Sequence, residues 1–522
     1  MLLPYANAFA ISFIAIVLWQ YLQPPPSSRE PPTITPTIPY IGHLLGMLFY
    51  GSRYLKQTGL REKHTSIFTL PMPGSRMYVV TDPLLAAAAQ RCKTLSFTPI
   101  IPDVTKRVLG LDRATVAITR RHLDPNPGKG GDLVAKRMKP GDNLDSLSRN
   151  SVSAIKSHVD SEKAYMVHYK AYKEVDLLEW VRHIVTLATA SHFYGNRNPV
   201  SQDPELERAF WDFDHGVGML LVNVWPSLTA CKAYRGREKL VAALANYLEE
   251  GDWKEGASPL IRERVKTALE HGWKLREVAR SELSFLFAGI VNVTTTTFWV
   301  LLQIYADASL LSQVRTEIES VMTLKWCDRE TIRTGRKSSV SAAEVARSGA
   351  GFECPTLSAV YQECLRLGSD NNSIRVVKED TLLADTWFLA KGSVVQIAGG
   401  VMHSDASLWG DNVTGFHPKR FLQPNNNEKT AAKQNGFRAF GGGKTLCPGR
   451  YFAMNQIQAF VIMVVLQFDL RPLSGDRIRV PKKNDRVLPV HILEPEEPVR
   501  ARLQLRSGWD SSLDVRVVFG RK

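Results

Sequence analysis

The most regular pattern of apolar and polar positions lies in the middle of the chain, where no proline occurs between Pro259 and Pro355. Through residues 276–306, REVARSELSFLFAGIVNVTTTTFWVLLQIYA, apolar side chains keep the spacing of a helix. Because proline would interrupt a helix, its absence allows an unbroken one. The pattern predicts a long central helix over these residues.

A second apolar run stands near the carboxyl end. Residues 448–468, PGRYFAMNQIQAFVIMVVLQF, are apolar over a length that suits a buried helix, and Pro448 and Gly449 mark its start. By contrast, the stretch 121–150 is rich in proline, glycine, aspartate and lysine and has the poorest helical pattern of the body. We expect a buried helix in the first segment and little helix in the second.

Shorter patterns predict a smaller β portion. Residues 66–70 and 76–80 indicate two strands around a turn, and residues 82–92 indicate a helix after them. Near the carboxyl end, residues 486–505 indicate strands and turns. The expected fold class is mostly α with a smaller β portion.

The amino end has the composition of a membrane span. Residues 2–22 carry no charge and are long enough to cross the roughly 30 Å hydrocarbon layer of a bilayer. Trp19 and Tyr21 stand where an interfacial aromatic belt belongs, and the first charged residue is Arg29. We predict a transmembrane signal anchor over residues 1–23, with a cleaved signal peptide as the alternative.

The rest of the chain divides into a linker and one large body. Repeated prolines in residues 24–50 favour a stiff, extended hinge. The chain has 522 residues, 44% of them hydrophobic and 22% charged, which is enough to bury a large core. We assign residues 51–522 to one catalytic domain, since they contain neither an internal repeat nor a long linker.

Cysteine spacing and charge exclude several classes of protein. The six cysteines form no C-x-x-C pair, which argues against a zinc ribbon, a dithiol redox motif or a disulfide framework: Cys92, Cys231, Cys327, Cys354, Cys364 and Cys447. The formal net charge of +15 is spread along the chain without a recognised nucleic-acid-binding motif. We expect no nucleic-acid partner; the basic surface faces solvent or an acidic partner protein.

The segment FGGGKTLCPGR, residues 440–450, allows two interpretations. A nucleotide-binding P-loop needs the pattern G-x-x-x-x-G-K-[ST], and its first glycine would have to stand where Arg438 does. The residues before it also lack the buried strand that feeds such a loop. A P-loop-like nucleotide-binding protein therefore remains a remote alternative.

The second interpretation is a metal site. Phe440, Gly443, Cys447 and Gly449 have the order F-x-x-G-x-x-x-C-x-G. A thiolate that binds haem iron needs a tight glycine-rich turn, so that backbone N–H groups point at the sulfur and a porphyrin can lie against the chain. Phe440 would shield the sulfur from water. We therefore expect Cys447 to be the axial ligand of a haem iron.

Two further motifs accompany this loop. YQECLRL places Glu363 and Arg366 on one face of a helix, where a surface ion pair is the common explanation. FHPKRF, residues 416–421, supplies Arg420. In order and spacing, the anchor, the long helix, these motifs and the cysteine loop resemble the cytochrome P-450 superfamily over nearly the whole chain. The resemblance implies a P-450 fold with Glu363, Arg366 and Arg420 in one buried structural network.

The resemblance also implies an activity. A microsomal P-450 is a haem-thiolate monooxygenase that inserts one oxygen atom from O2 into a C–H bond, here of a lipophilic polycyclic substrate such as a sterol, a terpenoid or a related secondary metabolite. Its cofactors would be haem b and NADPH, the latter used through NADPH-cytochrome P-450 reductase, with cytochrome b5 as a further partner. The expected location is the endoplasmic reticulum membrane, single-pass, with the catalytic domain in the cytosol.

Several positions need separate consideration within this resemblance. Arg375 stands where the family often has a haem-propionate arginine, with an ordinary surface arginine as the alternative. In AGIVN, residues 288–292, the family's acid and alcohol have become Val291 and Asn292. Asn292 cannot titrate, so any oxygen or proton-relay role would work through water or substrate hydroxyls, and a packed core amide is the alternative.

Two other family contacts are missing. Thr445 stands where an arginine or histidine commonly contacts a propionate, which leaves Lys444 beside it as a weaker candidate. No tryptophan between Trp19 and Trp180 supplies the W-x-x-x-R of helix C. Val291 and Asn292 in place of the acid-alcohol pair, together with Phe298-Trp299 and the CPGR ending, resemble the branch of cholesterol and oxysterol 7-alpha-hydroxylases and prostacyclin synthase. That branch leaves open an isomerase or dehydratase acting on a peroxide without external electrons.

Overall fold

The computed structural model describes residues 28–36, 38, 41–62, 64–122, 133–169, 172–330, 337–348, 351–422, 428–487 and 492–519. The predicted transmembrane anchor, residues 1–23, and the first part of the hinge lie outside the described residues. Helix α2 (Gly42–Arg61) begins within the 24–50 range of the predicted hinge. The described body is mostly helical with a smaller strand portion, which confirms the expected fold class.

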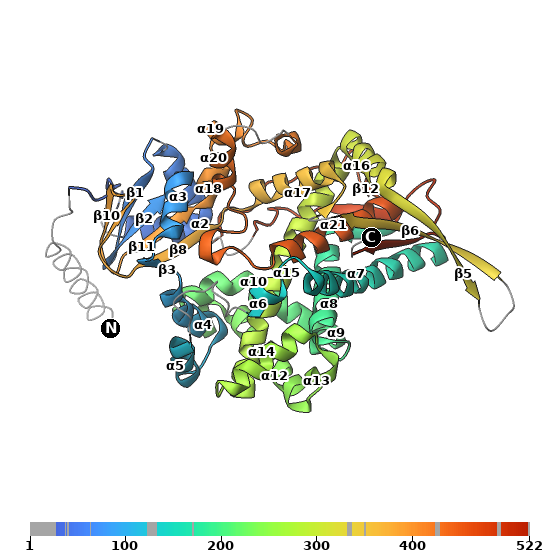
Figure 1. Cartoon of the computed structure of the whole chain (residues 1–522), viewed down its shortest axis with the longest axis horizontal. Coiled ribbons are helices and arrows are strands. Elements are labelled where there is room, and N and C mark those ends of the chain that lie inside the picture. The colour runs from blue at the N-terminus through green and yellow to red at the C-terminus, as the bar shows by residue number, and fades with distance from the viewer. Residues whose placement is uncertain are drawn as a thin grey trace, which may run out of the picture.

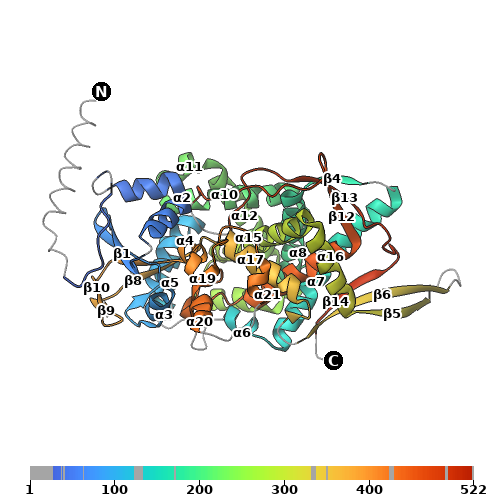
Figure 2. The ribbon, with the colours of Figure 1, turned by 90° about the horizontal axis from the view of Figure 1, so that it is seen from above.

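A five-stranded sheet forms one end of the molecule, and the long β5–β6 hairpin extends from the opposite end (Figures 1 and 2). The sheet has the order β1-β2-β11-β8-β3, with β2 and β11 parallel and the other neighbours antiparallel. Its strands are β1 (Ile67–Met72), β2 (Ser75–Val80), β3 (Leu95–Ser96), β8 (Asn372–Val377) and β11 (Val394–Ala398). Residues far apart in sequence are therefore joined in one layer.

The predicted hairpin and the helix after it are confirmed. β1 pairs with β2 from Ile67↔Val80 to Met72↔Ser75. Helix α3 (Pro83–Arg91) follows, because the Asp82 side chain accepts a hydrogen bond from the Leu85 N–H at 2.7 Å and proline occupies the first helical turn. This hairpin also supplies the edge to which β11 binds.

The helical part surrounds α15 (Leu275–Ala306), the predicted central helix. It packs against α8 (Leu177–Tyr194), α12 (Cys231–Glu250), α17 (Pro355–Gly368) and α21 (Arg450–Gln467). Within the described part, α15 is the one helix long and apolar enough to cross a membrane, yet 78% of its most apolar window is buried inside the fold. It is therefore the core helix of the body, and α21 is the predicted buried helix after the cysteine loop.

The remaining elements cover this core. The other helices are α4 (Ile101–Leu109), α5 (Arg113–His122), α6 (Leu133–Arg137), α7 (Asp142–Tyr169), α9 (Pro199–Gln202), α10 (Pro204–Val222), α11 (Pro226–Thr229), α13 (Trp253–Gly256), α14 (Pro259–Glu270), α16 (Ala308–Val321), α18 (Gly399–His403), α19 (Ala406–Trp409) and α20 (Glu428–Gly436). The other strands are β4 (Lys173–Asp176), β5 (Met322–Glu330), β6 (Lys337–Ser348), β7 (Gly351–Phe352), β9 (Thr381–Leu383), β10 (Trp387–Leu389), β12 (Phe468–Pro472), β13 (Arg500–Leu505) and β14 (Asp514–Val518).

The low helical content expected for residues 121–150 is wrong in its second half, where α6 and the start of α7 lie. Leu144, Leu147, Val152 and Ile155 of α7 are buried at helical spacing, and α7 packs against α8 and α21. Tertiary burial of this apolar face outweighs the weak local preference.

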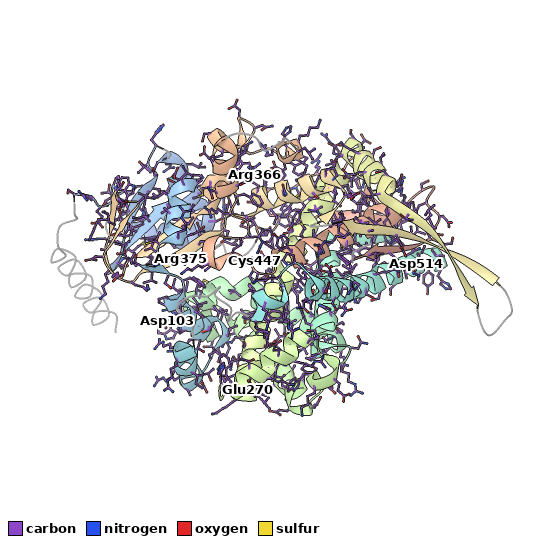
Figure 3. All side chains as sticks on the ribbon, in the orientation of Figure 1. Asp103, Glu270, Arg366, Arg375, Cys447 and Asp514 are labelled. Atoms are coloured by element: carbon purple, nitrogen blue, oxygen red, sulfur yellow. The ribbon has the colours of Figure 1, made fainter. Side chains whose placement is uncertain are left out.

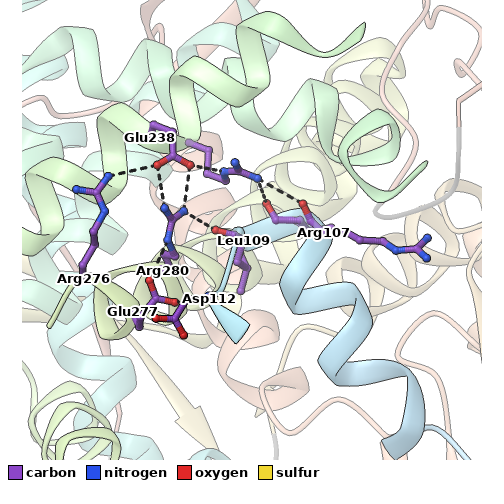
Figure 4. Close-up of polar contacts among 9 residues, drawn as sticks. Arg107, Leu109, Asp112, Glu238, Arg276, Glu277 and Arg280 are labelled. Atoms are coloured by element: carbon purple, nitrogen blue, oxygen red, sulfur yellow. Dashed lines mark hydrogen bonds and ion pairs between the residues drawn. The ribbon is translucent and has the colours of Figure 1, made fainter. Parts of the chain in front are cut away.

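A charged cluster ties α4 to the central helix (Figure 4). The Arg280 guanidinium donates to the Leu109 carbonyl at 2.7 Å and binds both Glu238 carboxylate oxygens at 3.0 and 2.9 Å. Gly110, at φ +76°, makes this approach possible, because a Cβ there would lie 2.9 Å from Arg280 Nη1. The segment between α4 and α5 is thus held to α15 and α12.

Candidate functional site

The cysteine loop begins at Phe440, contains the short 3-10 turn Gly443–Thr445 and leads into α21. The Cys447 N–H donates to the Phe440 carbonyl at 3.0 Å, which closes the loop. Gly441 and Gly443 have φ of +73° and +58°, and a Cβ on Gly443 would lie 2.8 Å from the Gln90 Cβ. Both backbone conformation and the close packing of α3 therefore require glycine here.

Two opposing effects act on the Cys447 thiol. Burial raises its pKa, while the backbone N–H groups of Gly449 and Arg450 and the Arg450 charge lower it. The lowering effect on the pKa arises because the sulfur lies just before the start of α21, where backbone N–H groups have no partners within the helix. A cation bound to the sulfur would shift this balance to the thiolate.

A cavity of about 310 Å³ opens beside Cys447. One wall is a single face of α15, formed at helical spacing by Phe285, Ala288, Gly289, Asn292, Val293 and Thr296. The opposite wall comes from the loop and α21, with Phe440, Cys447, Pro448, Gly449, Phe452 and Ala453. Figure 3 shows Cys447 near the middle of the molecule, far from surface residues such as Asp103 and Glu270.

Asn292 lines this cavity and is exposed to it. Its Oδ1 accepts a hydrogen bond from the Ile492 N–H at 2.9 Å, so the acceptor of the amide already has a partner. Nδ2 donates no hydrogen bond within the described part of the chain. The core-amide alternative thus holds for the oxygen only, and the donor group is left for a partner in the cavity.

The neighbouring threonines differ in their roles. Thr295 and Thr297 donate to the carbonyls of Val291 and Val293 at 3.2 and 2.8 Å, as threonines in helices commonly do. Thr296, between them, lines the cavity instead. Of these three threonines, only Thr296 lines the cavity.

Arg375, on β8, lies beside the cysteine loop and not on the surface. Only 4% of the residue is exposed, and burial lowers the guanidinium pKa. Nη2 donates to the Thr445 hydroxyl at 2.5 Å and Nη1 donates to the Ile374 carbonyl at 2.8 Å. Among the described residues, no carboxylate forms an ion pair with Arg375. Such a cation fits an acidic group that the chain itself does not provide.

Glu363, Arg366 and Arg420 meet in a buried network. Arg366 donates to both Glu363 carboxylate oxygens at 2.8 and 2.7 Å, and Arg420 Nε donates to Oε1 at 3.0 Å. Glu363 is 0% exposed and Arg366 1%, which excludes the surface-pair alternative. The His417 N–H donates to the same carboxylate at 3.0 Å. The predicted network therefore exists as a set of contacts.

The network extends to the cysteine loop through His403. Arg366 Nη1 donates to the His403 carbonyl at 2.6 Å. Burial lowers the pKa of His403 to about 4, so its ring is neutral near pH 7, with Nδ1 donating to the Ser369 carbonyl at 2.8 Å. Nε2 is then free to accept from the Arg438 N–H at 2.8 Å. Arg438 stands two residues before Phe440, so α17 and the loop share one continuous set of hydrogen bonds.

The sequence interpretation missed three site residues. Tyr361 lines the cavity, and burial together with nearby Cys447 raises its pKa well above the usual value. Gln90 packs against the glycines of the loop, and the Arg438 side chain reaches Gln90 Oε1 at 2.8 Å. The available signal in the sequence is Arg438, an arginine two residues before Phe440.

The geometry fits a haem-thiolate protein and does not support the nucleotide alternative. A half-buried cysteine lines a mainly apolar cavity, and buried cations that lack acidic partners among the described residues lie beside its loop. The loop follows helix α20 and not the strand that a P-loop requires.

Comparison with known proteins agrees with this class. The cytochrome P450 family model matches residues 31–498, so the chain belongs to the cytochrome P450 family. Cytochrome P450 monooxygenase nodJ of Hypoxylon pulicicidum is 32% identical over 504 residues, covering 94% of this chain and 93% of the relative. The protein is therefore an oxidoreductase of the cytochrome P450 monooxygenase type.

The similarity to sterol hydroxylases is also confirmed. Cytochrome P450 7A1 of Sus scrofa is 23% identical over 91% of this chain and 94% of the relative. The 7-alpha-hydroxycholest-4-en-3-one 12-alpha-hydroxylase of Homo sapiens is 24% identical over 91% of this chain and 93% of the relative.

The buried network predicts a large stability effect. Glu363→Gln should lower the free energy of unfolding by about 3–5 kcal/mol, because it leaves two buried guanidinium groups without their carboxylate. Denaturant unfolding followed by circular dichroism measures this loss. Glu270→Gln, at an exposed position on α14, is the matched control and should change stability by less than about 0.5 kcal/mol. Equal effects of the two substitutions would contradict the account.

Proposed function

We propose that this protein is a monooxygenase that inserts one oxygen atom from O2 into a C–H bond of a lipophilic polycyclic substrate. The observation that carries the proposal is the position of Cys447, which is half-buried and lines a cavity whose other wall is one face of α15. Family membership supports the reaction class, and the apolar lining supports the substrate class.

The cofactor proposed for this site is haem b. Cys447 Sγ would bind its iron, and Phe440 and the glycines of the loop would lie against it. Arg375 would bind one of its carboxylates, because this buried guanidinium has no acidic partner within the described chain. When bound, the haem supplies the activation of O2 with two external electrons.

The protein residues control water and protons around that centre. Phe193, Phe285, Phe452 and Leu365 contribute apolar surface to the cavity, which excludes bulk water from the site. Asn292 Oδ1 is held by the Ile492 N–H, and this fixes the amide so that Nδ2 can donate to an ordered water or a substrate hydroxyl. Protons would then arrive through that water or hydroxyl and not from a titrating side chain.

A sterol or a related polycyclic terpenoid is the proposed substrate class. The cavity of about 310 Å³ falls within the roughly 300–1,000 Å³ range of small-molecule sites. One relative reported above, the 7-alpha-hydroxycholest-4-en-3-one 12-alpha-hydroxylase, is named for a sterol-type substrate, and nodJ is a fungal monooxygenase. A rigid polycyclic substrate would lose little conformational entropy on entering such a site.

We further propose a location on the endoplasmic reticulum membrane, with the body in the cytosol and NADPH-cytochrome P-450 reductase, assisted by cytochrome b5, as electron donor. Exposed apolar side chains support membrane contact: Leu44, Leu48, Phe49 and Tyr50 on α2, and Val222, Val224, Trp225 and Leu228 around α11. Trp225 and Leu228 are each 75% exposed, which is unusual for large apolar side chains away from an interface.

Isotope labelling tests the reaction. The full-length protein, reductase and NADPH are incubated under ¹⁸O2 with a panel of sterols and polycyclic terpenoids that includes 7-alpha-hydroxycholest-4-en-3-one. We expect a product that carries one ¹⁸O atom and is not formed when NADPH or the reductase is omitted. A different result would identify an isomerase: no product from the panel, and conversion of a lipid hydroperoxide at the same rate with and without NADPH and reductase.

Substitution of Asn292 tests the proposed proton path. Asn292→Leu keeps the branched shape of the side chain and removes both the Nδ2 donor and the Oδ1 acceptor, so the fraction of consumed NADPH that appears as product should fall by about tenfold. NADPH oxidation and product formation are measured together. Thr295→Val, which removes a hydroxyl that bonds its own helix, is the control and should retain the wild-type fraction. Unchanged coupling in Asn292→Leu would assign Asn292 to packing alone.

A further inference from the structure

Two buried guanidinium groups lie against the same four residues of the cysteine loop, Gly442–Thr445. Arg375 donates to the Thr445 hydroxyl at one end, and Arg438 packs against Gly442 at the other. Thr445 Oγ1 also donates to the Gly442 carbonyl at 3.2 Å, which joins the two ends. Two buried positive charges beside one turn need a compensating anion.

Arg438 is the less satisfied of the two. It is 6% exposed, and burial lowers its guanidinium pKa. Its Nη1 donates to Gln90 Oε1 at 2.8 Å, but Nε and Nη2 are buried and have no hydrogen-bond partner among the described residues. Neither does any described carboxylate form an ion pair with it. A guanidinium in this state is costly unless another group binds it.

The backbone fixes where the Arg438 side chain lies. A Cβ on Gly442 would be 2.4 Å from Arg438 Nη1 and 2.6 Å from Gln90 Oε1, so the guanidinium and the amide occupy the space that a side chain would take. The Arg438 N–H is held by His403 Nε2 at 2.8 Å. Both ends of the residue are therefore positioned before any ligand binds.

The acidic groups that the chain lacks here are present in the proposed cofactor, whose two propionates are carboxylates. Two expected contacts to them are missing from the sequence, since Thr445 replaces a basic residue and W-x-x-x-R is absent. In the described part of α6 and the turn after it, Lys136 and Lys139 are exposed to solvent and do not replace those contacts.

We propose that Arg438 binds one haem carboxylate while Arg375 binds the other, with Gln90 and Thr445 orienting the two guanidinium groups. The proposal rests on haem being the cofactor of this site. It assigns to Arg438, a residue outside the F-x-x-G-x-x-x-C-x-G motif, the cofactor contact that the loop itself has lost.

The experiment compares haem loss from three full-length proteins: wild type, Arg438→Gln and Arg471→Gln. The last removes one positive charge at an exposed position of β12 and serves as the control. Transfer of haem to excess apomyoglobin is followed by absorbance. We expect Arg438→Gln to lose haem about tenfold faster than wild type, as removal of one charge-assisted hydrogen bond to a carboxylate predicts, and Arg471→Gln to match wild type.

A cofactor substitution separates carboxylate binding from a structural role. Wild type and Arg438→Gln are each reconstituted with haem and with haem dimethyl ester, which has no carboxylates. We expect the tenfold difference with haem to disappear with the ester. The same difference with both cofactors would overturn the proposal, because it would show that Arg438 acts on the fold and not on a propionate.

The two hypotheses fail in different ways. A wild-type protein that is folded by circular dichroism and retains neither cofactor would refute the haem site itself, and with it this inference. A wild type that binds haem normally, beside an Arg438→Gln variant with unchanged haem loss, would refute the role of Arg438 alone.

Discussion

The carboxylate of Glu363 is the point on which the arrangement of the site depends. It is fully buried and accepts hydrogen bonds from two guanidinium groups and one backbone N–H. None of these three charges is stable without a partner in a low-dielectric interior, so α17 and the segment that carries Arg420 must be in place together. From Arg366 the contacts continue through His403 to the backbone of Arg438, and so to the loop that presents Cys447.

This chain of contacts explains how a loop can hold a reactive sulfur with little regular structure of its own. The loop is closed by one backbone hydrogen bond, supported from behind by His403 and packed by Gln90 on α3. On the other side of the cavity, α15 is buried along most of its length and provides a rigid wall. The two walls are held by different sets of contacts and also pack directly on each other where α15 meets α21, as a site that must hold a cofactor and a substrate at defined positions requires.

The parts predicted from sequence are those with a strong local signal. The β1–β2 hairpin, α3, α15 and α21 follow from local hydrophobic patterns, and the loop follows from the spacing of its glycines about Cys447. Burial was not predictable in the same way. From sequence alone, Glu363 and Arg366 could equally have formed an ion pair on the surface. The buried ion-pair network includes Arg420, which stands 54 residues beyond Arg366 in the chain.

Long-range contacts also decide the cases that the sequence interpretation missed. The start of α7 is helical because its apolar face packs on α8 and α21. The Arg438 side chain is held in place by a hydrogen bond to Gln90, 348 residues earlier in the chain. Asn292 was recognised as a departure from the family pattern, yet its bond to the Ile492 N–H, 200 residues away, could not be inferred. In each case the partner is set by the fold and not by neighbouring residues.

The central claim is that Cys447 holds the iron of a haem in this cavity. Its most direct test is the absorption spectrum of the reduced protein with carbon monoxide, recorded for wild type and for Cys447→Ala. The account predicts a strongly red-shifted Soret band in wild type that is lost in the variant, because only a thiolate ligand produces that shift. A wild-type band like that of histidine-ligated haem proteins, in correctly folded material, would contradict the account.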